Sequence, residues 1–106
     1  MGRMVICCFR PKPGKEDELL GVVMDHLKVL RQEGLATERP TLAMRAQDGT
    51  ILEVFEWVSE EAAREAHSNP AVLELWGRYG AASDLTSFGQ LAEAKEFFPH
   101  FEPIDM

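Results

Sequence analysis

The chain has 106 residues, of which 45% are hydrophobic and 27% are charged, and its formal net charge is −7. This length predicts a single domain over residues 1–106, and no apolar run approaches the roughly 18 residues that cross a membrane. The acidic balance argues against nucleic acid and anionic membranes as partners, because both bind cationic patches, and without a secretory signal pattern we expect a cytoplasmic protein.

The first third of the chain predicts a strand followed by a helix. The apolar run Met4–Phe9 is typical of a buried strand. Apolar residues then recur at helical spacing through Lys15–Glu33, and Gly34 is placed to end that helix. The apolar stripe of this helix is expected to comprise Leu19, Leu20, Val23, Met24, Leu27 and Leu30.

A β-hairpin is predicted in the middle of the chain. Asp48-Gly49 separates the strand-like runs Thr41–Gln47 and Thr50–Val58, and both turn positions tolerate positive φ. Alternation places Ile51, Glu53, Phe55 and Trp57 on one side of the second strand and Leu52, Val54, Glu56 and Val58 on the other. Because both sides carry large apolar groups, we expect this strand to be covered on both faces.

The last third predicts helices and a final strand. Ser59 is a suitable N-cap for a second helix, and Asn69-Pro70 is suited to restart it. Residues 81–92 are expected to form a helical or loop connector. Glu96–Ile104 is expected to be an edge strand, because its two prolines cannot donate backbone hydrogen bonds. The element order is β-α-β-β-α-β, an α+β ferredoxin-like fold with a four-stranded antiparallel sheet and helices on one face.

The two cysteines, Cys7 and Cys8, are adjacent in the first predicted strand. Neighbouring side chains of a strand point to opposite faces, which disfavours a disulfide between them. We therefore expect two reduced cysteines that fill apolar space.

Four short motifs carry a resemblance to a known family. They are Pro13-Gly14-Lys15, Trp57-Val58-Ser59-Glu60-Glu61-Ala62, Ala66-His67 before Ser68-Asn69-Pro70, and the aromatic segment Phe97–Phe101, expected to lie in the final strand. Together they resemble the dimeric α/β-barrel superfamily, and within it the antibiotic biosynthesis monooxygenase-like proteins. The resemblance implies that two subunits pack their sheets face to face, with the helices outside, so that a homodimer forms one barrel.

The resemblance also implies a range of functions. Similar proteins oxygenate hydroxyaromatic polyketides without metal or flavin, while others degrade haem, isomerise lactones or catalyse dehydration. We expect cofactor-independent oxygenation, or related chemistry, of a small aromatic or polyketide-like compound, with no cofactor and no metal. The alternative is a non-catalytic homodimer that binds a small ligand or accompanies a pathway. Fold alone does not choose between these functions.

Four side chains are the candidate site residues. His67 is the candidate catalytic base, because histidine titrates near neutral pH; the alternative is that it interacts with the end of its helix. Trp57, Trp76 and Tyr79 are the candidate substrate-binding residues, and the alternative for the tryptophans is a place in the core.

Two carboxylates, Glu53 and Glu56, fall on strand faces that are otherwise apolar. An inward carboxylate is a candidate base. A salt bridge to Arg45 on the neighbouring strand would explain one of them equally well.

Overall fold

The computed structural model describes residues 1–105 and has an α+β fold, as predicted. The strands are β1 (Arg3–Pro11), β2 (Leu42–Arg45), β3 (Ile51–Trp57), β4 (Ser83–Thr86) and β5 (Glu102–Ile104). The α-helices are α1 (Glu16–Gln32), α2 (Glu60–Ala66) and α3 (Pro70–Ala82), and the 3₁₀ helices are η1 (Phe88–Gln90) and η2 (Ala92–Lys95). No helix in this described part of the chain is both long and apolar enough to span a membrane.

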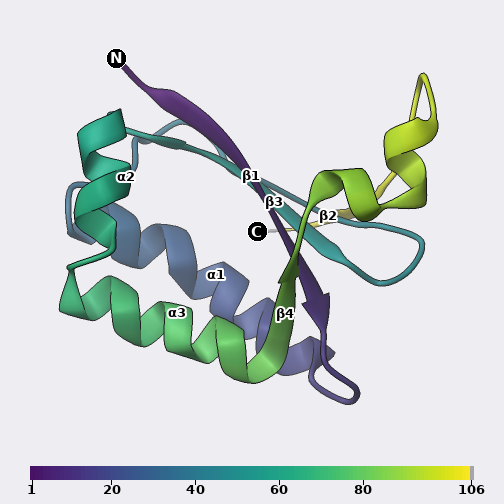
Figure 1. Cartoon of the computed structure of the whole chain (residues 1–106). Helices are drawn as coiled ribbons and strands as arrows, with labels where there is room; N and C mark the ends of the chain where they lie inside the picture. The colour runs from purple at the N-terminus through teal and green to yellow at the C-terminus, as the bar shows by residue number, and fades with distance from the viewer. Residues whose placement is uncertain (106) are drawn as a thin grey trace.

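The strands form one antiparallel sheet in the order β4-β1-β3-β2-β5. Figure 1 shows the three α-helices on the same side of this sheet. The face that they cover is called the inner face here, and the opposite one the outer face. Phe9, Ile51 and Phe55 belong to the inner face and are buried. The predicted helices on one face of an antiparallel sheet are therefore present.

The sheet has five strands rather than the predicted four. β4 is Ser83–Thr86, inside the segment expected to be a connector, and it pairs with β1. The predicted final strand over Glu96–Ile104 is wrong for most of its length. Only Glu102–Ile104 forms a strand, β5, at the free edge of β2.

Both corrections have a physical reason. The Ser83–Thr86 stretch is short and polar, so its strand arises from the ladder with β1 rather than from local propensity. Phe97 and Phe98 are 98% and 86% exposed, and no strand passes through them. Pro103 is compatible with β5 because an edge strand needs only one side of its backbone for pairing.

The predicted chain reversals and helix ends are confirmed. Gly34 and Gly49 have φ of 73° and 92°, values that L side chains rarely adopt. The Ser59 hydroxyl accepts a hydrogen bond from the Ala62 N–H at the start of α2. The Asn69 side chain accepts from the first two free N–H groups of α3. A cap of this kind stabilises a helix by about 1 kcal/mol.

The buried face of α1 is rotated slightly from the predicted stripe. Its buried residues are Leu19, Val22, Val23, His26, Leu27 and Leu30. Leu20 and Met24, which were expected to widen the stripe, are only half-buried. The stripe therefore includes one polar side chain, that of His26.

The outer face is covered at one end only. Leu91, between η1 and η2, packs with Cys8, Ala46 and Leu52 on that face. At the other end Met4, Ile6 and Leu42 are each more than half exposed. Ile6 and Leu42 flank Val54 in adjacent strands. These four side chains are called the outer apolar patch here.

Candidate functional site

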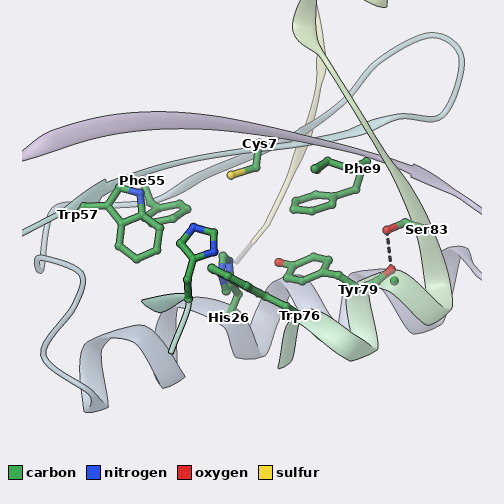
Figure 2. A pocket seen from close by; sticks show the side chains of 11 residues that line it. Cys7, Phe9, His26, Phe55, Trp57, Trp76, Tyr79 and Ser83 are labelled. Carbon is green, nitrogen blue, oxygen red and sulfur yellow. Dashed lines mark hydrogen bonds between the residues drawn. The ribbon is translucent and has the colours of Figure 1, made fainter. Parts of the chain in front are cut away.

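A pocket of about 390 Å³ lies between the inner face of the sheet and the helices. Figure 2 shows aromatic side chains of β1 and β3 above it and of α3 below it. The residues that line it are Cys7, Phe9, His26, Phe55, Trp57, His67, Trp76, Tyr79, Gly80, Ser83 and Leu85. Most of these side chains are apolar or aromatic, so the pocket suits an apolar ligand.

The lining residues divide by exposure into a floor and a mouth. His26, Phe9, Phe55 and Tyr79 are buried and form the floor. His67, Gly80 and Leu85 are exposed and form the mouth, while Cys7, Trp57 and Trp76 are half-buried between them. A ligand that enters past the mouth would therefore lose water on most of its surface.

Two polar side chains of the floor, His26 and Tyr79, meet at Glu53 behind it. His26 Nδ1 lies 3.0 Å from Glu53 Oε1 and 3.1 Å from Oε2. The Tyr79 hydroxyl donates to Glu53 Oε1 at 2.9 Å. Glu53 is 0% exposed and His26 is 3% exposed. Glu53, His26 and Tyr79 form a buried polar cluster that β3, α1 and α3 hold in place.

The sequence places these three side chains by simple periodicity. His26 lies four residues after Val22 and four before Leu30, on the buried stripe of α1. Glu53 alternates with Ile51 and Phe55 along the inner face of β3. Tyr79 follows Val72 and Leu75 on the buried side of α3. Each residue points inward because its neighbours in the period are apolar.

The rings around the cluster are closely packed. Tyr79 stacks on Phe9, with ring centroids 4.1 Å apart and planes 12° from parallel. The His26 ring makes edge contacts with Phe55 and Tyr79, at centroid distances of 5.3 and 5.1 Å. The Ser83 hydroxyl donates to the Tyr79 carbonyl at 2.7 Å and ties the end of α3 to β4 (Figure 2). Such packing leaves the imidazole little freedom to rotate.

Burial and the Glu53 carboxylate keep the neighbouring acids protonated. Burial, and then the negative charge of Glu53 and that of Cys8, raise the pKa of the Cys7 thiol to about 12. Burial, and then the charge and hydrogen bond of Glu53, also raise the pKa of Tyr79. Tyr79 therefore remains a hydrogen-bond donor to Glu53, and Cys7 is a neutral thiol rather than a nucleophile.

One nitrogen of the cluster has no assigned partner. Nε2 of His26 is buried and accepts or donates no hydrogen bond within residues 1–105. A carboxylate is an acceptor only, so Glu53 selects the His26 tautomer with hydrogen on Nδ1. In neutral His26, Nε2 then carries a free lone pair. Unpaired buried polar atoms are rare, so each one needs an explanation.

All four predicted site residues line the same pocket. The exposed His67 ring contacts Trp76 edge-on, with centroids 5.0 Å apart. Trp57 is half-buried against Phe55, so it is both a core and a lining residue. The Tyr79 ring lines the pocket, and its hydroxyl donates to Glu53. Their roles in binding and catalysis stay predictions.

The suggested salt bridge between a β3 carboxylate and Arg45 is wrong. Arg45 pairs with Glu16 at 2.8 Å and with Glu102 at 2.6 Å. Glu56 lies on the outer face and accepts from Arg39 and Thr37. Glu53 is therefore the inward carboxylate of this strand.

His26 was not among the candidate residues from the sequence. Its signal was a histidine at an apolar position of a regular helical stripe, which becomes visible only when the stripe is aligned on Val22 and Leu30. Its partner, Glu53, lies 27 residues away. No local motif joins the two.

A second hollow of about 300 Å³ is lined by Gln47, Glu93, Glu96, Phe98 and His100. Glu93 is buried there and accepts from the Gln47 backbone N–H at 2.8 Å. This interaction anchors η2 to the β2–β3 hairpin. Across residues 1–105, no group of three or more His, Cys, Asp or Glu side chains is placed to hold a metal ion.

Comparison with protein-family models finds no match to this chain, and comparison with curated proteins finds none either.

Proposed function

We propose that this protein is a small cofactor-independent oxygenase, similar to the antibiotic biosynthesis monooxygenase-like proteins, that acts on a hydroxyaromatic compound. The observation that carries this proposal is the aromatic pocket of about 390 Å³ with the imidazoles of His26 and His67 among its lining residues. This volume is in the usual range for small-molecule sites. It suits a flat compound of the size of a naphthol or an anthrone.

The chemistry needs only a base, an apolar pocket and dioxygen. An imidazole removes a proton from the activated carbon or hydroxyl of the substrate, and the electron pair stays on the substrate. For an anthrone-type compound, dioxygen adds to the resulting carbanion, the O–O bond breaks as water leaves, and the carbon becomes a carbonyl. The substrate is the reductant and dioxygen the oxidant. No outside electron donor is required.

The proposal is tested by oxygen uptake with a panel of anthrone- and hydroquinone-type compounds. We expect uptake above the autoxidation rate with the wild-type protein and with His100→Asn, whose imidazole lies in the second hollow. The double variant His26→Asn/His67→Asn should lose it. Uptake equal to autoxidation for every compound would contradict oxygenase activity. If a panel compound then still raised the melting temperature, the non-catalytic ligand-binding alternative would be supported instead.

We also propose that the sheet has a ferredoxin-like βαββαβ core, with β5 added at its edge, and that two copies pair through their outer faces. The outer apolar patch supports this pairing. Met4, Ile6 and Leu42 are 56%, 55% and 58% exposed. A contiguous apolar patch on an exposed sheet face is typical of an interface, and an isologous dimer would cover it with its own copy.

Size-exclusion chromatography with light scattering tests the dimer. We expect a dimeric mass for the wild type and a monomeric mass for Ile6→Asp, because an aspartate would be buried without a partner in the interface. Glu74→Gln, which removes a charge from the exposed surface of α3 on the other side of the sheet, is the control that should stay dimeric. A wild-type monomer at micromolar concentration would contradict the pairing.

A further inference from the structure

We propose that His26, held by Glu53, is the group that accepts a proton from the bound compound, and that Glu53 and Tyr79 are its positioning residues. The inference rests on the proposed function, because it assigns the base of the same pocket. It differs from the sequence-based expectation, which gave that role to His67.

The two imidazoles of the pocket lie at different depths. His26 belongs to the buried floor of the pocket, whereas His67 is exposed at the mouth. Nδ1 of His26 is occupied by both oxygens of Glu53, at 3.0 and 3.1 Å. Nε2 has no hydrogen-bond partner in the chain from residue 1 to residue 105, and the ring that carries it lines the pocket. Nε2 is itself buried, so a bound compound reaches it by displacing a neighbouring ring, and its hydroxyl then supplies the partner that Nε2 lacks.

Glu53 is placed to balance the charge that His26 gains with the proton. When a hydroxyaromatic compound transfers its proton, its O–H bond breaks, the electron pair stays on oxygen, and an N–H bond forms at Nε2. The resulting imidazolium lies 3.0 Å from the Glu53 carboxylate, in a site that excludes water. An opposite charge at this distance stabilises the imidazolium, and low exposure strengthens the attraction.

Tyr79 holds the carboxylate of Glu53 in place. Its hydroxyl donates to Glu53 Oε1, and its raised pKa keeps that proton in place. The carboxylate therefore receives two hydrogen bonds and has a fixed orientation toward Nδ1. This arrangement of a base oriented by a carboxylate is the general logic of an activated histidine.

His67 has no comparable support. It follows α2, and its ring contacts Trp76. No carboxylate contact is found for its ring among the hydrogen bonds and ion pairs of residues 1–105. A proton on His67 would be balanced by solvent rather than by a fixed charge.

The test uses a bound probe and does not need turnover. The probe is 2-hydroxyanthraquinone, whose hydroxyl has no neighbouring carbonyl to bond and whose phenolate absorbs at longer wavelength than its phenol. We expect the wild-type protein to favour the bound phenolate by about tenfold or more over His26→Asn, which is one pKa unit of the probe. Asparagine retains a donor near the Nδ1 position but has no basic nitrogen, so the contact to Glu53 can persist. Glu53→Gln should lose part of the effect, and His100→Asn should retain all of it.

The possible outcomes are distinct. Equal ionisation of the probe in wild type and His26→Asn, or loss of ionisation in His67→Asn alone, would overturn the assignment. Ionisation that depends on His26 without oxygen uptake would keep the assignment and contradict the proposed oxygenase. Circular dichroism and the probe's dissociation constant show whether each variant is folded and binds.

A second measurement does not depend on any variant. Nitrogen NMR of histidine-labelled wild-type protein should show His26 with hydrogen on Nδ1 and a bare Nε2, and the Nε2 signal should shift when the probe binds. Hydrogen on Nε2 with a bare Nδ1 would overturn the assignment, and so would an Nε2 signal that the probe leaves unchanged.

Discussion

The two faces of β3 place the same residue type in opposite environments. Glu53 on the inner face is 0% exposed and bonded to His26 and Tyr79. Glu56, three residues later on the outer face, pairs with the largely exposed Arg39 at 2.9 Å. The hydrogen bond from Arg39, and then that from Thr37, lower the pKa of Glu56.

The difference shows that burial, rather than residue type, decides what a carboxylate can do. Around Glu53, water is excluded, so each hydrogen bond is strong and each missing one is costly. The Glu56 side chain is 14% exposed and that of its partner Arg39 is 60% exposed, so solvent partly screens this pair and can replace a lost partner. The inner face can therefore orient an imidazole, while the outer face provides an apolar surface with charges at its margin.

The two faces should differ most in the stability that is lost when the carboxylate of each face is removed. Glu53→Ala leaves the His26 Nδ1–H and the Tyr79 hydroxyl without an acceptor, and we expect it to lower the free energy of unfolding by about 3–5 kcal/mol. Glu56→Ala is the matched control on the outer face and should cost far less. Urea denaturation measures both. Similar losses for the two variants would contradict the contrast between the faces.

The next effect is a loss of stability at alkaline pH. An ordinary thiol has a pKa of 9.0, whereas that of Cys7 in the folded protein is raised to about 12. Below pH 9 both the folded and the unfolded chain hold this proton. Above it only the unfolded chain releases it, so stability falls as pH rises toward 12, by up to about 1.4 kcal/mol per pH unit for this group. Tyr79, whose pKa is raised from 10.0, adds to the loss at higher pH.

Urea midpoints measured from neutral to strongly alkaline pH check this expectation. Cys7→Ala should flatten the profile more than Cys8→Ala, because Cys7 is next to the inner-face carboxylate whereas burial alone raises the pKa of Cys8. A profile that Cys7→Ala leaves unchanged would show that the thiol does not carry the effect.

The smallest expected change in stability comes from removing a single methylene group on each face. Ile51 is 0% exposed on the inner face, and Ile6 is 55% exposed on the outer face. We expect Ile51→Val to cost about 0.5–1.5 kcal/mol. Ile6→Val should stay within about 0.5 kcal/mol when measured on the dilute monomer. An equal loss for Ile6→Val that disappears on dilution would place that side chain in the proposed dimer interface.

Much of the fold could be predicted because its signals are local. Ser59, Asn69 and Gly34 end or begin helices through contacts within a few residues, and Asp48-Gly49 forms its turn by itself. The short strand β4 could not be predicted in the same way. Its residues have no strong strand propensity, and pairing with β1, more than 70 residues away in sequence, makes them a strand.

The candidate site, like the fold, could be predicted from the sequence only in part. Alternation and helical spacing are properties of the sequence, and they indicated Trp57, Trp76, Tyr79 and an inward carboxylate. Whether that carboxylate would meet an arginine or a histidine depended on which helix crosses the sheet at Glu53, and that is a property of packing.

The sequence by itself determined the α+β class, the helices, the hairpin and which acids and aromatics share a side of β3, because each follows from a period or a cap. Only the tertiary structure brought His26 to Glu53 and Tyr79, left Nε2 without a partner within residues 1–105, and placed His67 at the mouth of the pocket. The physical reason is that Tyr79 and His26 lie 26 and 27 residues from Glu53 in the sequence. The packing of α1 and α3 on the sheet brings them together, and no local pattern encodes these contacts.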